Sequence, residues 1–442
     1  MTTTQNKTSR TLPPGTLGLP FIGETLSFLK DSSFAKKRHQ QYGAIFKSSI
    51  FGSPTIFVEG PAANQFVLTH ENEYFIVKWP PSTTKLLGDF SLALQQGSIH
   101  QKRRKLIYQV FQPRAIAGYI ETMESLTQSY CDNWVKMETL TWYPELRNYT
   151  FDIACKLFVG MDGASQRALG HAFEVWVNGL FSIPINLPWT RFGRAWRSRQ
   201  FLLAEVEKII RQRQQDNLSD VNDALSLLIN ATDDDGNALS IEELKDQILV
   251  LLFAGHETLT SAIASFCLLM VQHPEVLKKV RDEQEKFKEE PLTLETLKQM
   301  TYLEQVLKEV LRLVPPVGGG FRQIIETCEF MGYELPKGWN ISYGINLTHK
   351  DKDVYENPET FDPERFSPER ASGYKPFSFV TFGGGMRECI GKEFARLEMK
   401  IFAVKLARYY QWELLPDQDI NLIPVPTPHP VDGLRVKFSQ LT

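Results

Sequence analysis

The stretch from Ser240 to Pro274 constrains the fold of this 442-residue chain more than any other. Ser240-Ile-Glu-Glu243 fits the capping box that begins a helix, and the His273-Pro274 step ends one. Residues 248–254 and 259–271 are apolar on nearly every side of that helix. About thirty residues at ~1.5 Å each span roughly 45 Å, the width of a whole domain. The pattern predicts a helix buried in the middle of a large protein, not a membrane span.

Four residues, Gly255-His256-Glu257-Thr258, interrupt the apolar run at mid-length. Glycine costs about 1 kcal/mol relative to alanine inside a helix, and a buried carboxylate must be partnered or protonated. Ala254, Gly255 and Thr258 share a face, where the Thr258 hydroxyl can bond back to the Ala254 carbonyl. One interpretation is a polar notch satisfied by neighbouring side chains. The other is a groove for a diatomic ligand beside a metal, with Thr258 donating a hydrogen bond and Glu257 linking it to solvent protons.

Composition excludes several other classes of protein. The 49 basic and 52 acidic side chains give a net charge of −3, so nucleic-acid binding would need a local basic patch. Five cysteines without a C-x-x-C pair predict no disulfide framework or zinc site, and a reducing, cytoplasmic compartment. The first twenty residues contain no apolar run that would suit a secretory signal or a transmembrane anchor. We expect a soluble chain with a flexible tail over residues 1–11 and a single domain over 12–442.

The fold class predicted from periodicity is mainly α with small β-sheets. Helical patterns dominate from residue 62 to about 313, and a helical stretch is also expected near 23–41. Short alternating runs at 45–50 and 54–59 predict a hairpin. Further strand-like runs lie at 321–325, 328–335 and 339–345, before a long helix from 392 to about 410.

A glycine-rich loop from Phe382 to Gly391 precedes that last helix and contains Cys389. Free backbone N–H groups and the helix dipole there favour a thiolate, which is a metal ligand. Phe382 can shield the sulfur, and Arg387 offers a cation. Two alternatives are a buried structural cysteine and a phosphate-binding loop. The phosphate interpretation is weak because neither G-x-x-x-x-G-K-[ST] nor G-x-G-x-x-G is present.

The full string F-x-x-G-x-R-x-C-x-G resembles the haem-thiolate loop of the cytochrome P450 monooxygenases. Residues 254–258 resemble that family's oxygen-binding motif A/G-G-x-D/E-T, and residues 363–366 its P-E-R-F segment. The resemblance covers nearly the whole chain. It implies a single-domain cytochrome P450 fold with haem b, iron protoporphyrin IX, between the long central helix and the helix after the cysteine loop. Cys389 would be the iron ligand.

The resemblance also implies a set of haem contacts. The family's W-x-x-x-R segment corresponds to His100 through Arg104, with histidine in place of tryptophan. The implied cofactor-binding residues are His100, Arg104, Ala254, Gly255, Arg322, Phe382, Gly385, Arg387, Cys389 and Gly391. His256 and His349 are expected to be structural. Lys102, Arg103 and Lys105 form either a solvated basic face or a docking surface for an acidic electron-transfer partner.

The family's E-x-x-R helix matches Glu309 and Arg312. The spacing alone is not specific, because Glu393 and Arg396 satisfy it too. The family pattern adds Arg365 as a third, buried member, and the resemblance implies that this structural triad braces the cysteine loop.

The implied activity is a monooxygenase reaction in which Glu257 and Thr258 deliver protons to bound dioxygen. The chain looks most like the cyanobacterial branch that hydroxylates retinoic acid, itself similar to animal retinoic-acid hydroxylases. This predicts a cyanobacterial cytoplasmic enzyme for a retinoid or apocarotenoid, supplied with electrons by ferredoxin and its reductase. Candidate substrate contacts are Trp79, Phe181, Phe253, Val317 and Gly318.

Other functions stay open. Fatty acids and sterols are alternative substrates for the same chemistry. A haem-thiolate isomerase or lyase would have little use for Glu257 and Thr258. A non-enzymatic haem or gas sensor would normally carry an output domain, and the sequence contains no sign of one.

Overall fold

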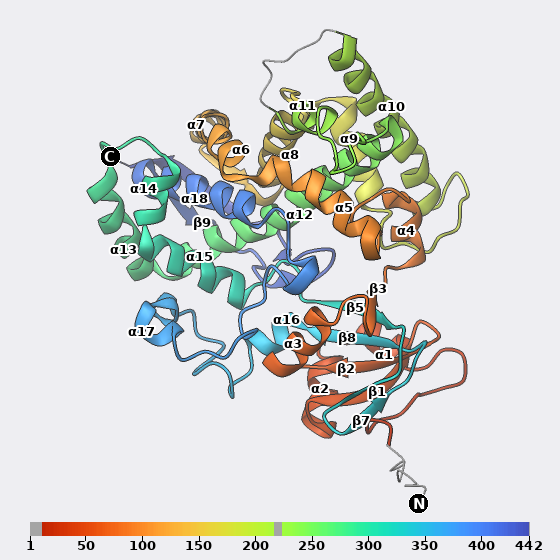
Figure 1. Ribbon diagram of the computed structural model, residues 1–442. Coiled ribbons are helices and arrows are strands. Elements are labelled where there is room, and N and C mark those ends of the chain that lie inside the picture. The colour runs from red at the N-terminus through yellow and green to blue at the C-terminus, as the bar shows by residue number, and fades with distance from the viewer. Residues whose placement is uncertain (1–10, 216–222, 442) are drawn as a thin grey trace, which may run out of the picture. The chain divides into compact units, whose positions relative to one another are not determined.

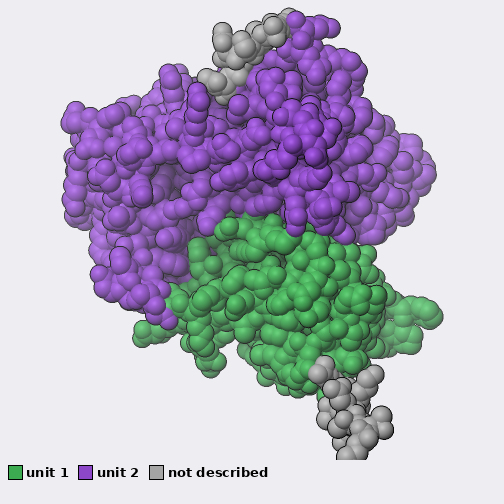
Figure 2. Space-filling model, viewed as in Figure 1, with its two compact units in different colours: residues 1–78, 317–359, 374–388 green, residues 79–316, 360–373, 389–442 purple. Residues whose placement is uncertain are grey.

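The computed structural model describes residues 11–215 and 223–441, so nearly all of the predicted tail, residues 1–11, lies outside it. Contacts divide the chain into two compact units (Figure 2). The sheet unit comprises residues 11–78, 317–359 and 374–388, and the helical unit comprises 79–215, 223–316, 360–373 and 389–441. The single domain over 12–442 stays a prediction.

The sheet unit is built on a five-stranded sheet in the order β1-β2-β8-β5-β3 (Figure 1). The predicted hairpin is confirmed, because β1 and β2 pair antiparallel with Ile45 opposite Val58. Strand β8 pairs parallel with β2, and β5 and β3 continue antiparallel. The elements of this unit are α1 (Thr25–Lys30), α2 (Phe34–Tyr42), β1 (Ile45–Ile50), β2 (Ser53–Val58), α3 (Pro61–Thr69), β3 (Phe75–Val77), β5 (Gly319–Ile324), β6 (Cys328–Phe330), β7 (Tyr333–Leu335), β8 (Asn340–Gly344), α16 (Ile345–His349) and the 3-10 turn η5 (Gly385–Arg387).

Two expectations for this unit were too simple. The helical stretch near 23–41 is two helices, because Asp31 turns to an extended conformation and its carboxylate accepts the Ser33 backbone N–H at 2.9 Å. The strand-like run 328–335 is itself a hairpin of β6 and β7. Met331 and Gly332 both have positive φ in its two-residue turn, at 52° and 81°.

The helical unit holds most of the helices, as predicted. A three-stranded sheet in the order β4-β12-β9 and the short pair β10-β11 accompany them. The elements are α4 (Pro81–Leu87), α5 (Gly97–Ile107), η1 (Tyr108–Phe111), α6 (Pro113–Gly118), α7 (Ile120–Met137), β4 (Thr139–Thr141), α8 (Trp142–Val159), η2 (Ala164–Gln166), α9 (Ala168–Val177), α10 (Arg191–Gln215), α11 (Ala224–Ile229), α12 (Ile241–Gln272), α13 (Pro274–Gln284), η3 (Glu285–Phe287), α14 (Leu294–Gln299), α15 (Thr301–Leu313), η4 (Pro363–Phe366), α17 (Pro368–Ala371), α18 (Lys392–Tyr409), β9 (Tyr410–Leu414), β10 (Leu422–Ile423), β11 (His429–Pro430) and β12 (Arg435–Gln440).

Helix α12 is the predicted central helix, and its bounds agree with the sequence signals. The Ser240 hydroxyl accepts the Glu243 backbone N–H while the Glu243 carboxylate accepts the Ser240 N–H, so the capping box is present. The helix packs against α8, α10, α15 and α18. It is long and apolar enough to cross a membrane, yet 78% of its most apolar window is buried inside the protein. Burial by other helices accounts for that composition.

Glu398 on α18 is a buried carboxyl that the sequence did not single out. It is 1% exposed, and neither carboxyl oxygen has a hydrogen-bond partner among the described residues. Burial raises the pKa of this carboxyl well above its usual value. The side chain therefore holds its proton in the folded protein at pH values where the unfolded chain has lost it.

We expect Glu398→Gln to remove a pH-dependent loss of stability. A carboxyl with a raised native pKa makes the unfolded state the more ionised one, so wild-type stability falls as pH rises above the ordinary glutamate range. As pH rises, the unfolding free energy of Glu398→Gln should exceed that of wild type by up to about 1.4 kcal/mol more for each pH unit. Urea unfolding at pH 5.5, 6.5 and 7.5 measures it. Glu393→Gln, on the exposed side of the same helix, is the control. An unfolding free energy that changes with pH equally in wild type and in Glu398→Gln would contradict the expectation.

Candidate active site

The notch in α12 forms an accessible face on an otherwise buried helix. Ala254 is exposed and Gly255 and Thr258 are half-buried, whereas Leu252 and Leu259 on either side are 2% exposed. The Thr258 hydroxyl donates to the Ala254 carbonyl at 2.7 Å, which is the bond expected from the sequence. Small side chains and a hydroxyl therefore line one side of the helix, where a small ligand can approach the backbone.

Glu257 points to α8, where Arg147 holds it. Its carboxylate lies 2.8 Å from Arg147 Nη2 and accepts a bond from Nη1 at 3.2 Å, although Glu257 is only 1% exposed. Burial raises the pKa of Glu257, and the Arg147 guanidinium opposes that shift. The ring of Tyr143, one turn before Arg147, stacks on His429 at 4.8 Å. The carboxylate thus has a cationic partner whose own side chain is 23% exposed.

Arg147 could not be predicted from a local pattern, because 110 residues separate it from Glu257. His256 turns to a different part of α8, where its Nδ1 lies 2.8 Å from the Thr150 hydroxyl. Burial lowers the pKa of His256 well below its usual value, so the ring is neutral. This agrees with the structural role expected for it.

The predicted triad of Glu309, Arg312 and Arg365 is present and fully buried. Arg312 Nε donates to Glu309 Oε2 at 2.7 Å, and Arg365 Nε lies 3.4 Å from Glu309 Oε1. The Asp362 backbone N–H also donates to Glu309, at 3.0 Å, so the carboxylate ties residues 360–366 to α15. In the second E-x-x-R pair, Glu393 is 57% exposed and Arg396 34%, and Arg396 also bonds Glu304 at 2.6 Å. That the triad braces the cysteine loop stays a prediction.

Cys389 differs from the other cysteines by its accessibility. It is exposed, two residues before the Gly391 N-cap of α18, whereas the other four thiols are buried. Burial raises the pKa of those four thiols, which makes them poor ligands (Cys131, Cys155, Cys267 and Cys328). Cys389 is therefore the thiol that combines access with a helix N-terminus, as expected of a metal ligand.

The loop before Cys389 belongs to the sheet unit, where Glu71 organises its arginine. Glu71 is 5% exposed, and it accepts bonds from Arg387 Nε at 2.7 Å and from Arg322 Nε of β5 at 3.0 Å. Gly385 has φ +62°, and a Cβ there would lie 2.1 Å from the Leu68 carbonyl oxygen. Arg322 and Arg387, the two arginines of this unit that are expected to bind the cofactor, therefore share one carboxylate. Sequence reasoning missed Glu71, which lies 251 residues from Arg322.

Helix α5 presents the remaining predicted cofactor contacts. His100 is 3% exposed, and Arg104 lies one turn further on and is half-buried. The three neighbouring basic residues all have acidic partners in the helical unit. Lys102 pairs with Asp235 at 3.0 Å, Lys105 with Asp234 at 2.7 Å, and Arg103 with Glu243. The basic face proposed for docking is thus largely neutralised within the chain.

The candidate substrate residues divide between the two units. In the helical unit, Trp79 is half-buried with Nε1 donating to the Ala93 carbonyl at 3.0 Å, and the Phe253 ring meets Trp176 edge-on at 5.9 Å. Phe181 is 50% exposed in the loop before α10. Val317 and Gly318 are exposed in the sheet unit. Their role as substrate contacts stays a prediction.

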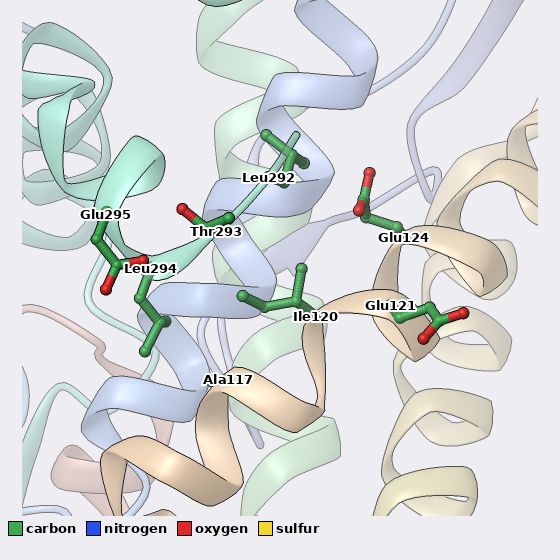
Figure 3. Close-up of a pocket in the computed structure, with 8 residues that line it drawn as sticks. All are labelled: Ala117, Ile120, Glu121, Glu124, Leu292, Thr293, Leu294 and Glu295. Carbon is green, nitrogen blue, oxygen red and sulfur yellow. The ribbon is translucent and has the colours of Figure 1, made fainter. Parts of the chain in front are cut away.

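A separate groove of about 420 Å³ opens on the helical unit between α6, α7 and the segment before α14 (Figure 3). None of the residues predicted to bind haem or substrate lines it. Its walls include the carboxylates Glu121, Glu124 and Glu295. The groove is therefore not part of the candidate active site.

The residues present fit a haem group. An exposed thiol at a helix N-terminus can hold iron, the small-residue face of α12 can accept a diatomic ligand, and arginines fixed by Glu71 can meet propionates. Within residues 11–215 and 223–441, no group of three or more His, Cys, Asp or Glu side chains could hold a metal ion. A metal bound through one protein sulfur is consistent with this donor set.

Comparisons with known proteins cover the whole of this candidate site. A family model described as Cytochrome P450 matches residues 13–432. The putative cytochrome P450 120 of Synechocystis sp. is 53% identical over 443 residues, covering 100% of both chains. Cytochrome P450 26A1 of Danio rerio is 37% identical, over 97% of this chain and 90% of its own.

Comparison with solved structures gives the same family fold. Cyanobacterial CYP120A1 with retinoic acid bound superposes with a TM-score of 0.93 at 53% identity, covering 98% of this chain and 100% of its own. The cytochrome P450DA heme domain, at 20% identity, has a TM-score of 0.88 over 98% of both chains and shares the fold.

Arg312→Ala should destabilise the protein far more than the matched change at the second E-x-x-R pair. Removing one partner of a buried ion pair costs about 3–5 kcal/mol, because a buried charge loses its compensation. Arg396→Ala removes a partly exposed side chain whose second partner, Glu304, keeps Lys400 at 2.9 Å, so it should cost about 1 kcal/mol or less. Urea unfolding measures both, and haem bound per mole of purified protein should fall only in Arg312→Ala. Equal losses in the two variants, or normal haem loading of Arg312→Ala, would refute the bracing role.

Proposed function

The chain belongs to the cytochrome P450 family of haem monooxygenases, and on this premise we propose that it hydroxylates retinoic acid or a related retinoid. The observation that carries the monooxygenase reaction is the notch of α12, where Thr258 and Glu257 present a hydroxyl and a buried carboxylate at one point of the helix. Such a pair suits an enzyme that must move protons to a small oxygen ligand, and it has no obvious use in a passive haem carrier.

We propose haem b as the cofactor, held through the Cys389 thiolate. Bound haem supplies the dioxygen chemistry, which a thiolate ligand favours by pushing electron density toward O–O cleavage. The dipole of α18, whose N-terminus follows Cys389, favours the anionic sulfur. Arg322 and Arg387, oriented by Glu71, would hold propionate carboxylates, together with His100 and Arg104 of α5.

Proton delivery is assigned to the two polar residues of the notch. The Thr258 hydroxyl donates to Ala254, so its oxygen lone pairs face the accessible side of the helix and can accept a proton or order a water. Burial raises the pKa of the Glu257 carboxyl, which lets it regain a proton more readily than an exposed glutamate. Arg147, partly exposed, connects this carboxylate to solvent.

The retinoid assignment rests on likeness. A relative of known structure, 53% identical to this chain, binds retinoic acid. The candidate contacts Trp79, Phe181, Phe253 and Val317 are apolar or aromatic, which suits an elongated apolar ligand. Fatty acids and sterols share that character and are the competing substrates.

An external redox partner must supply electrons, and we propose ferredoxin with its reductase in a cyanobacterial cytoplasm. An acidic carrier would dock on Lys102 and Lys105 of α5 by displacing the exposed carboxylates of Asp235 and Asp234 that pair with them. Turnover with ferredoxin, ferredoxin reductase and NADPH separates a monooxygenase from the isomerase and sensor alternatives, because only the monooxygenase consumes reducing equivalents as it forms product.

Substrate class is tested by spectral titration and product analysis. We expect all-trans retinoic acid to shift the haem spectrum of the holoprotein at concentrations at least about tenfold below those needed for a long-chain fatty acid or a sterol. Hydroxylated retinoid should form only when dioxygen and the electron supply are both present. Cys389→Ser, which loses the thiolate ligand, should lose the spectrum and the activity. A fatty acid that binds tighter and is turned over faster would overturn the retinoid assignment.

Thr258→Ala should uncouple electron consumption from product formation. Loss of the hydroxyl removes the group that relays a proton or orders a water at the notch, so product per NADPH should fall at least about tenfold while peroxide release rises. Thr258→Ser keeps the hydroxyl and is the matched control. The measurement compares NADPH consumed, peroxide released and product formed, and unchanged coupling in Thr258→Ala would remove the residue from the mechanism.

A further inference from the structure

Helices α13 and α18 meet at a cluster of side chains that offers more hydrogen-bond donors than acceptors. Arg281 and Gln284 lie three residues apart on one face of α13, and Arg408 lies in the last turn of α18. Arg408 Nε donates to Gln284 Oε1 at 3.2 Å, and Arg281 Nη2 donates to the Tyr410 carbonyl at 3.0 Å. These two bonds hold both guanidinium groups beside the Gln284 amide.

Three nitrogen atoms of this cluster are buried and have no hydrogen-bond partner in the described ranges of the chain. They are Arg281 Nε, Gln284 Nε2 and Arg408 Nη2, and Gln284 is only 1% exposed. All three are donors, and folded proteins rarely leave a buried donor without an acceptor. Three of them in one place indicate an acceptor that comes from outside the chain.

The charge of the cluster is also uncompensated. Among the residues that the structure describes, no carboxylate lies within ion-pair distance of Arg281 or Arg408. Burial lowers the pKa of Arg281 below its usual value, and no carboxylate opposes that shift. Elsewhere in the helical unit a buried arginine has an acidic partner, as Arg213 has in Asp223 at 2.6 Å. An anion would supply here what a carboxylate supplies there.

Arg408 also lines a small pocket of about 150 Å³ on the helical unit. The pocket adjoins the groove of Figure 3, because Glu124 lines both. Its other charged side chains are Lys288, Lys405 and Glu290, so three cations face two carboxylates. Glu124 already pairs with Lys405 at 3.3 Å. The walls of the pocket therefore carry a net positive charge, and Arg408 connects them to the buried donors.

We propose that this pocket binds a phosphate group, either as inorganic phosphate or as part of a small metabolite. Arg408 would meet the anion first, and Gln284 and Arg281 would supply further donors behind it. Lys288 and Lys405 would add positive charge. A phosphate group has several acceptor oxygens, and its geometry matches the forked donors of a guanidinium. The proposal does not depend on the haem chemistry or on the apolar substrate.

Water is the competing occupant of the buried donors. One water molecule has two lone pairs, whereas the cluster presents three donors, and water does not compensate the charge of two guanidinium groups. A phosphate group satisfies both requirements. The two occupants also differ in their consequences, because only an anion makes the stability of the fold depend on its concentration.

The test titrates the holoenzyme with inorganic phosphate or with glycerol 3-phosphate, while sodium chloride keeps the ionic strength constant. We expect one phosphate group bound per chain in equilibrium dialysis, with a dissociation constant below about 1 mM. The melting temperature should rise with phosphate concentration. Binding of glycerol 3-phosphate at least about tenfold tighter than inorganic phosphate would identify a metabolite as the source of the group, and the reverse order would identify the inorganic ion.

Two variants test the arginines. Arg408→Gln and Arg281→Gln should each weaken phosphate binding at least about tenfold and abolish the phosphate-dependent rise in melting temperature. An arginine with a purely structural role would instead lower the melting temperature equally with and without phosphate. Arg211→Gln, at a 58% exposed arginine of α10, is the matched control and should bind phosphate as wild type does. Haem absorbance and circular dichroism verify that each variant is folded.

The measurements on wild type keep the proposal testable even where a variant fails to fold. Absence of saturable phosphate binding to wild type would overturn it. So would a melting temperature that follows ionic strength alone, or equal phosphate affinity of wild type and Arg408→Gln.

Discussion

A helix buried along most of its length can admit polar side chains only where each finds a partner, and this condition shapes the helical unit. Three consecutive residues of α12 meet it in three different ways. Thr258 bonds to its own helix, while His256 and Glu257 reach Thr150 and Arg147 of α8. Thr150 and Arg147 lie three residues apart and share a face of α8. The polar notch therefore sets how these two helices face each other, and a shifted register would leave a buried charge without compensation.

Both units contain one buried carboxylate that binds two arginines. Glu309 joins Arg312 and Arg365 in the helical unit, and Glu71 joins Arg322 and Arg387 in the sheet unit. At Glu309 the Thr360 carbonyl accepts from both guanidinium groups, at 3.3 and 3.5 Å, so the cluster serves the chain itself. At Glu71 two guanidinium groups are held side by side, an arrangement that suits an anionic group such as a carboxylate and agrees with the propionate contacts proposed for these arginines.

Local sequence patterns predicted the structural features that depend on residues close together in the chain. The capping box at Ser240, the β1–β2 hairpin and the Thr258 bond to Ala254 all follow from spacing within a few positions. Resemblance to a family supplied the Glu309 triad, which spacing alone could not distinguish from Glu393 and Arg396. Glu71 lies 251 positions from Arg322, and Arg147 lies 110 positions from Glu257. Neither was predicted, because no sequence periodicity links residues so far apart. The break between α1 and α2 was missed because a single Asx turn at Asp31 outweighed helical periodicity.

The ion pairs on α5 have a consequence for the electron carrier that we propose to dock there. Lys102 and Lys105 already hold Asp235 and Asp234, so an acidic carrier that arrives there exchanges one carboxylate for another. All four side chains are well exposed, and such pairs are individually weak, so the exchange is easy but gains little energy. A carrier bound on these terms would dissociate quickly after each delivery. A short-lived complex suits a reaction that takes up two electrons one at a time, because a carrier that stayed bound after donating its electron would block the next carrier.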